Sequence, residues 1–204
     1  MAADVAMAPP AAELTRNRTL LVGTAYAALA SIMVFVGLIA VYVAIRQNNE
    51  YIVENGLDGG MLWFPEGAVQ IAPGTMMMFT TWISAFTMAW AVQAIRNDDR
   101  RNAYVALAVT LLMGAAVINQ MVFAILDFGR PVGDSTPGLL LYTIYGSYIV
   151  FMAVAVAFVF LMGVRAVAGQ FNSTNADGIE AAALYWFATV LVYLPIWYLI
   201  TITK

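Results

Sequence analysis

The chain alternates long apolar runs with polar connections, and the runs are long enough to cross a bilayer. A hydrocarbon core of about 30 Å requires about 20 consecutive, mostly apolar residues in a helix. Five runs reach this length, and none carries a charged residue away from its ends. They predict membrane-spanning helices over residues 19–45, 75–95, 103–126, 138–167 and 179–202.

The connections carry their own signals. RNDDRR joins the second and third spans and is so short that these helices must be antiparallel neighbours. Thr136 followed by Pro137 predicts the N-cap and first residue of the fourth helix, and Asp177 with Glu180 predicts a capping box at the fifth. The predicted fold class is an all-α integral membrane bundle of five helices.

Residues 1–18 are small, polar and Pro-containing, and they bury too little apolar surface to fold alone. We therefore expect a disordered tail before a single membrane domain over residues 19–204. A cleaved signal peptide is the alternative. Asp4 and Glu13 do not suit a basic leader, and the following apolar run is too long for a signal core.

Basic residues divide unequally between the two sides of the predicted membrane domain. Short cytoplasmic loops hold the excess of Lys and Arg. One side carries Arg16, Arg18, Arg96, Arg100, Arg101 and Arg165, and the other carries Arg46, Arg130 and Lys204. This distribution predicts a cytoplasmic N-terminus and an exterior C-terminus, with the long acidic connection after the first span outside.

The amino-acid composition excludes several kinds of cofactor site and catalytic arrangement. Of 204 residues, 63% are hydrophobic and 10% charged, and the chain has neither Cys nor His. This excludes disulfides, thiolate metal sites, iron–sulfur clusters, His-ligated haem or copper, and Ser-His or Cys-His catalysis. The net charge of −3 gives no reason to expect a nucleic-acid partner.

The spans hold few groups that could act chemically. Proton and ion carriers place ionisable side chains at membrane depth, and these spans do not. Asn119 and Gln120 could line a transport path, but a hydrogen bond to a neighbouring helix or a partner chain is the favoured interpretation. Ala106, Thr110 and Gly114 form a stripe of small residues that predicts close helix packing.

Several short segments stand in a characteristic order. They are MVFVGLIAVY at 33–42, Trp63-Phe64-Pro65, SAFTMAWA at 84–91, Arg100 and Arg101, Gly114 with Gln120, Tyr145-Gly146-Ser147, and GIEAAALYW at 178–186. In this order they resemble cytochrome c oxidase subunit III of the haem-copper oxidase superfamily, in its five-helix bacterial form. The last segment is close to the family's G-V-E-A-A-A-L-Y-W and is the most specific match.

The resemblance implies a non-catalytic accessory subunit, without cofactors, in a bacterial inner membrane. Its expected partners are oxidase subunits I and II, which would hold the haem and copper, together with membrane lipids. Its expected roles are assembly, lipid binding and sustained turnover. A similar partner of a nitric oxide reductase is one alternative, and a small stand-alone transporter with Asn119 and Gln120 near its site is another.

The resemblance also indicates which positions make contacts and which family groups are missing. The family's first-helix glutamate falls at Ser31 and its fourth-helix histidine pair near Val156 and Val159, and Phe187 follows the last motif where the family has histidine. Roles of those groups therefore do not carry over. The expected contact positions are Trp63 and Pro65 in the exterior loop, Gly146 and Ser147 at a close helix approach, Glu180 at the fifth-helix cap, Tyr185 and Trp186 beside it, and Gly114, Gln120 and Tyr145 within the spans.

Overall fold

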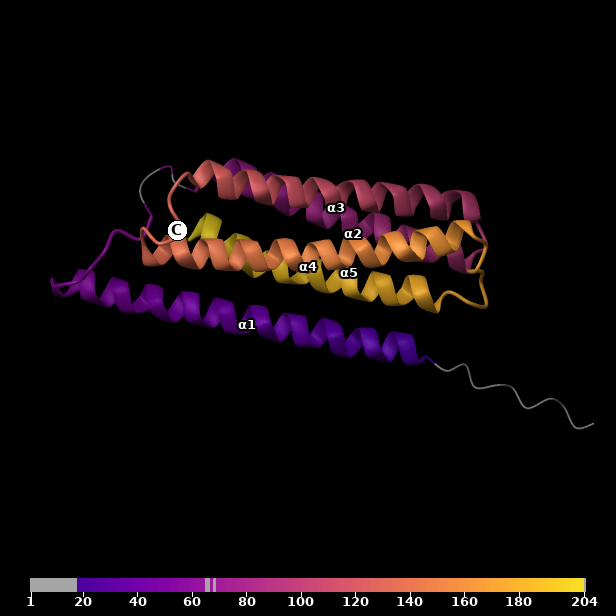
Figure 1. Cartoon of the computed structure of the whole chain (residues 1–204), viewed down its shortest axis with the longest axis horizontal. Helices are drawn as coiled ribbons and strands as arrows, with labels where there is room; N and C mark the ends of the chain where they lie inside the picture. Colours follow the sequence, from indigo (N-terminus) through magenta and orange to yellow (C-terminus); the bar gives the residue numbers. More distant parts are fainter. Residues whose placement is uncertain (1–17, 65–66, 68, 204) are drawn as a thin grey trace, which may run out of the picture.

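The computed structural model describes residues 18–64, 67 and 69–203, and within them it contains five long helices and no β-strand. The helices are α1 (Thr19–Glu54), α2 (Ile71–Arg96), α3 (Arg100–Phe128), α4 (Thr136–Val167) and α5 (Asp177–Trp197), followed by a π-helical turn, η1 (Tyr198–Ile202) (Figure 1). All five are long and apolar enough to cross a membrane. The all-α membrane class is confirmed, whereas the tail predicted over 1–18 lies almost wholly outside the described residues.

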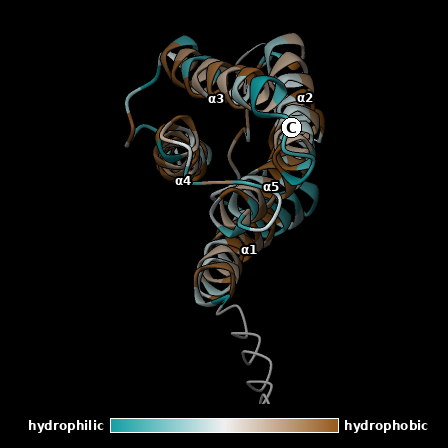
Figure 2. Ribbon diagram, turned by 90° about the vertical axis from the view of Figure 1, so that its right-hand side faces the viewer, coloured by the Kyte–Doolittle hydropathy of each residue, from teal (hydrophilic) through white to brown (hydrophobic). Residues whose placement is uncertain are grey.

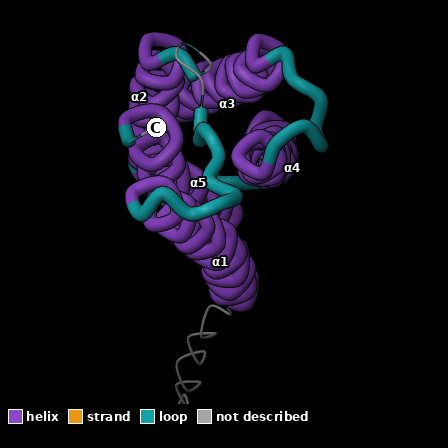
Figure 3. Tube along the Cα trace, turned by 90° about the vertical axis from the view of Figure 1, so that its left-hand side faces the viewer, coloured by secondary structure: helices purple, strands orange, loops and turns teal. Residues whose placement is uncertain are grey.

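Helix α5 occupies the centre of the bundle. It packs against α1, α2 and α4, while α3 closes the other side by packing on α2 and α4 (Figure 3). In the most apolar 18-residue window of each helix, 56% of α5 is buried but only 17% of α1. Because α1 lies at one edge and α3 at the opposite edge, both present long apolar faces outward (Figure 2).

The helices alternate in direction, so the connections gather at two ends. The amino-terminal end holds the start of α1, the α2–α3 turn and the α4–α5 connection, and the carboxyl-terminal end holds the other connections and η1 (Figure 1). The first four predicted spans each lie within one helix, the fifth continues from α5 into η1, and α2 and α3 are antiparallel neighbours. The prediction of five helices long enough to cross a membrane is confirmed.

Helix α1 extends beyond the span predicted over residues 19–45 and ends at Glu54. Arg46 Nε donates to Glu50 Oε1 at 2.9 Å, one helical turn further on, and Arg46 Nη1 donates to Thr203 Oγ1 at 2.8 Å. The guanidinium therefore supports the extra turns and ties them to the chain beyond η1.

Both helix starts that were predicted from capping signals are displaced. Ser135, not Thr136, caps α4, because its hydroxyl accepts from Gly138 N at 3.3 Å. The capping box at α5 is wrong: α5 begins at Asp177 itself, after Ala176, and has no side-chain cap. Glu180 binds an arginine of α2 instead, as described below.

A short polar contact joins the α2–α3 turn to the α4–α5 connection. Asp98 adopts φ 56°, a left-handed conformation that Asp tolerates better than most residues. Its Oδ1 accepts from Ser173 N at 2.7 Å. Hydrogen bonds from the hydroxyl and the amide of Ser173 favour the charged carboxylate and lower the pKa of Asp98. Asp99 then caps α3 by accepting from Asn102 N at 3.1 Å.

Candidate functional site

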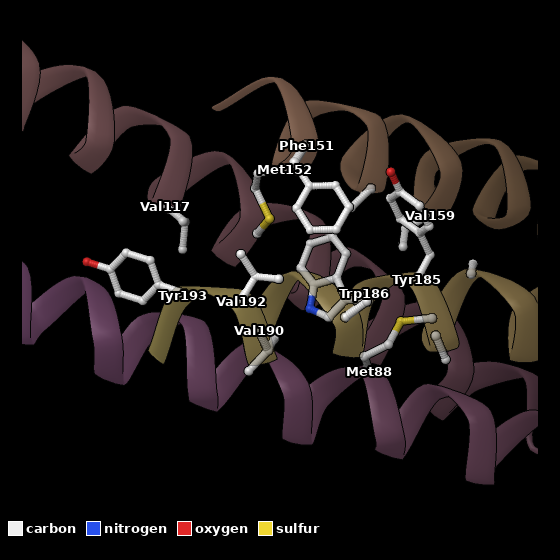
Figure 4. Close-up of a cluster of buried hydrophobic side chains, with 14 of the residues drawn as sticks. Met88, Val117, Phe151, Met152, Val159, Tyr185, Trp186, Val190, Val192 and Tyr193 are labelled. Carbon is white, nitrogen blue, oxygen red and sulfur yellow. The ribbon is translucent and has the colours of Figure 1, made fainter. Parts of the chain in front are cut away.

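Trp186 lies at the centre of the region where α2, α3, α4 and α5 meet. Its side chain is fully buried, and its Nε1 donates to Ser84 Oγ of α2 at 3.1 Å. Figure 4 shows the indole among other buried side chains, with its nitrogen on the side that faces α2. A buried indole N–H requires an acceptor, so this hydrogen bond fixes which way the ring points.

Gly114 makes room for the Trp186 ring on α3. A Cβ added at Gly114 would lie 2.5 Å from Trp186 Cη2 and 2.7 Å from Val156 Cγ2 of α4. Contacts this short do not occur in real structures, so only glycine fits without a shift of its neighbours. The stripe of Ala106, Thr110 and Gly114 is buried along its whole length, in agreement with the packing role predicted for it.

The serine and threonine hydroxyls beside Trp186 are paired. Ser84 donates to Thr81 O at 2.6 Å while accepting from the indole. Thr87 of α2 and Thr110 of α3 lie 2.8 Å apart between their hydroxyl oxygens, and Thr110 also donates to Ala106 O. The region thus combines dense packing with satisfied hydrogen bonds, which suits structural support rather than acid–base chemistry.

Tyrosines extend the packed region on both sides of Trp186. Tyr185 packs edge-on against Phe151 of α4, with ring centroids 5.2 Å apart. Tyr148 donates to Thr189 O and Tyr193 donates to Gly74 O, both at 3.3 Å. These hydroxyls connect α4 to α5 and α5 to α2, so tyrosines hold the middle of α5, where Tyr185 also lies, to its neighbours.

Glu180 holds α5 to α2 at the amino-terminal end. Its Oε1 lies 3.0 Å from Nε of Arg96, and the two side chains are 21% and 54% exposed respectively. The carboxylate therefore acts between helices and not as the cap that the sequence predicted. An ion pair this exposed contributes only about 0.2–1 kcal/mol, so its value lies in fixing the relative position of the two helices.

Trp63 belongs to a row of aromatic rings at the carboxyl-terminal end. Its Nε1 donates to Tyr42 OH of α1 at 3.0 Å, and Tyr42 is fully buried. Edge-on ring contacts continue from Trp63 to Phe64 and then to Phe128 of α3, with centroids 6.1 Å apart at both steps. The α1–α2 connection is thereby pinned across the bundle. Pro65, the other residue predicted there, lies outside the described residues.

Tyr145 lines a small, partly open pocket of about 30 Å³ at the same end, together with Gly74, Thr201 and Asp127. Gly146 and Ser147 are half-exposed on α4, and a Cβ at Gly146 would meet nothing within 4 Å. The close approach predicted at these two residues therefore does not occur within this chain. Gln120 Oε1 is buried without a hydrogen-bond partner among the described residues.

Only some of the predicted contact residues lie next to one another in the structure. Gly114 and Trp186 meet directly, whereas the Glu180, Trp63 and Tyr145 contacts lie at the two ends of the bundle. Sequence reasoning missed Ser84 and Arg96, although both lie at or near motif segments. Among the residues that the structure describes, no three Asp or Glu side chains form a group that could hold a metal ion.

Comparison with known proteins identifies the family of this chain. The family model for cytochrome c oxidase subunit III matches residues 13–203. This chain belongs to the cytochrome c oxidase subunit III family. Similar proteins include cytochrome c oxidase subunit 3 of Patiria pectinifera, of Loxodonta africana and of Prototheca wickerhamii, each 25% identical over 138 residues. Each alignment covers 66% of this chain and 53% of the relative.

The chain thus spans about half the length of the curated relatives it matches. The resemblance read from the motifs is confirmed at the level of the family. Membership in this family, together with five helices of spanning length, makes the chain a multi-pass membrane protein.

Proposed function

We propose that this chain is the non-catalytic third subunit of a respiratory haem-copper oxidase. It packs beside subunits I and II in a bacterial inner membrane, and those partners hold the haem and copper. The family match over residues 13–203 carries the proposal. The centre of the bundle is packed with apolar and hydroxyl side chains, and the chain has neither His nor Cys. Both observations favour a structural role over a catalytic one.

We further propose that the amino-terminal end faces the cytoplasm. Among the described residues this end carries Arg18, Arg96, Arg100, Arg101 and Arg165. The opposite end carries Arg46 and Arg130 together with acidic side chains of the α1–α2 connection. An excess of basic residues marks the cytoplasmic side of a membrane protein, and acidic residues add little to this bias.

Open apolar grooves between helices support the lipid-binding part of the proposal. A groove of about 380 Å³ lies between α1 and α5 and is lined by Ala28, Leu29, Leu184 and Leu191 among others. A second, of about 310 Å³, lies between α3 and α4 around Leu107 and Phe160. Grooves that are apolar throughout and open to the bilayer suit acyl chains.

The test is purification of the tagged chain from its native membrane in a mild detergent, followed by a reduced-minus-oxidised spectrum and mass identification of the co-purified proteins. An a-type haem signal with oxidase subunits I and II is the expected result. A b- and c-type signal with nitric oxide reductase subunits would replace the oxidase by that enzyme. A colourless, folded, single-chain product would overturn the proposal and favour the transporter alternative.

The contribution to turnover is tested separately in the purified complex. Glu180→Ala and Trp186→Ala should weaken retention of this chain or shorten sustained oxygen consumption while the haem spectrum of the partner stays unchanged. Exposed Phe79 of α2 provides the control Phe79→Ala, which removes a side chain outside the packed centre. Unchanged retention and turnover in both test variants would contradict the supporting role.

A further inference from the structure

Helix α3 carries a regular outward face that no other helix among the described residues covers. Exposed residues recur along it at alternating steps of four and three, and we call this set the α3 outer face: Arg101, Val105, Ala108, Leu112, Ala115, Asn119, Val122 and Leu126. The mean step is about 3.6 residues, the α-helical repeat, so these side chains lie along one side, or seam, of the helix. The contacts of α3 with α2 and α4 use its other sides, and no helix lies beyond it in Figure 2.

Asn119 makes this face different from an ordinary lipid-facing surface. Its side chain is exposed and has no hydrogen bond to any described residue. It precedes Asp127 by eight residues, or about 12 Å along the helix axis, so its amide lies within the hydrocarbon layer. A carboxamide left unpaired there is unfavourable, because lipid tails offer neither donors nor acceptors.

Two polar side chains on other outward faces bond to their own helices. Ser31 of α1 donates to Ala27 O at 2.9 Å, and Thr143 of α4 donates to Leu139 O at 2.8 Å. Their hydroxyls are therefore satisfied by their own helices. The amide of Asn119 has no such bond, so its hydrogen-bonding groups point to a partner outside the chain.

Small residues flank Asn119 along the seam. Ala115 lies one turn before it and Ala108 a further two turns back, and both are exposed. Small side chains allow the backbones of two membrane helices to approach closely, and a polar group between them adds an interhelical hydrogen bond. An acyl chain could fill the same surface but could not bond the amide.

We propose that the α3 outer face docks a transmembrane helix of the catalytic partner subunit, and that this helix presents an amide or hydroxyl at the depth of Asn119. The inference rests on the proposed function, since it names the surface through which the subunit joins its complex. The helix packs along the seam over Ala108 and Ala115, and Asn119 sets its register through the hydrogen bond.

Retention of the haem-bearing partner in the purified complex measures the contact. Asn119→Leu keeps the side-chain size but removes the hydrogen bond, and it should lower retention roughly threefold to tenfold. Ala115→Phe should lower retention of the partner further, because the larger side chain blocks close approach of the two helices. Asn119→Gln should retain more of the partner than Asn119→Leu, because it keeps an amide. Ala157→Phe, on the exposed side of α4, is the matched control and should have no effect.

Because the chain has no cysteine, a single introduced thiol reports proximity directly. Val122→Cys carrying a photo-crosslinker should join the partner subunit, and Ala157→Cys should not. If the unaltered chain retains its partner but the seam variants and Ala157→Phe behave alike, the docking face is refuted and the proposed function stands. If no haem-bearing partner co-purifies with the unaltered chain, both the docking face and the proposed function are refuted. A crosslink between two copies of this chain overturns the inference in favour of self-association.

Discussion

Gly114→Ala tests whether the fit between α3 and the Trp186 ring determines the stability of the bundle. The added methyl would lie 2.5 Å from Trp186 Cη2 and 2.7 Å from Val156 Cγ2, so at least two neighbours must move. Overpacking of this kind costs roughly 1–3 kcal/mol. Removing a mid-helix glycine returns about 0.5–1 kcal/mol, so the net loss lies between about 0 and 2.5 kcal/mol.

The assay is thermal unfolding of the purified chain in mild detergent, followed by far-ultraviolet circular dichroism. At about 2–4 °C per kcal/mol for a protein of this size, Gly114→Ala should lower Tm by up to about 10 °C. Gly163→Ala is the control, because Gly163 is also within a helix but a Cβ there meets nothing within 4 Å. This control should leave Tm unchanged or raise it slightly.

A double-mutant cycle separates the steric clash from other effects. Trp186→Phe shortens the ring that meets the new methyl, although it also removes the hydrogen bond to Ser84. In the Gly114→Ala background it should therefore cost about 1–2 kcal/mol less than in the unaltered chain. Equal Tm shifts for Gly114→Ala and Gly163→Ala, or additive effects in the cycle, would refute the assigned packing.

Three further changes address the ends of the bundle. Glu180→Gln should destabilise the chain by no more than about 1 kcal/mol, and a cycle with Arg96→Gln in the same unfolding assay should assign most of that loss to the pair. The Asp98 contact should persist above the ordinary carboxyl pKa of 3.8 and be lost as the pH falls through the lowered pKa of the folded state. Protection of the Ser173 amide against hydrogen exchange should fall over the same pH range. Asp98→Asn should abolish this pH dependence, because asparagine does not titrate. Asn49→Ala removes two side-chain bonds of 2.9 Å to the Met61 backbone, so limited proteolysis should cut residues 55–64 faster, whereas an unchanged rate would show that these bonds do not hold the connection.

The spans could be predicted from the sequence because the bilayer imposes a length and an apolar character on each helix independently. No long-range information is needed to recognise residues 138–167 as a span. Contacts between helices are different. Gly114 and Trp186 were both recognised as motif residues, but nothing in the sequence showed that one fills the space left by the other.

The wrong predictions share a physical cause, which is that a tertiary partner or a closer local one outcompeted the expected interaction. Glu180 fits a capping box by its spacing, yet Arg96 from another helix binds its carboxylate. Thr136 has the position of a cap before Pro137, yet the neighbouring Ser135 accepts from Gly138 N and α4 begins one residue earlier. Local capping patterns weigh about 1 kcal/mol, so they yield to such alternatives.

The two positions where the family resemblance places a histidine pair hold valines with apolar surroundings in this chain. Val159 is fully buried, and Val156 packs against the space at Gly114. Histidines there would bring polar nitrogens into the packed region and would need partners. With valine at both positions, the indole and hydroxyls of the centre pair only with each other and with the backbone. The buried groups left without partners, such as Gln120 Oε1 and Thr201 Oγ1, do not belong to these bonds. Apolar packing therefore fills both positions, and the hydrogen bonds of the centre need no titratable group there.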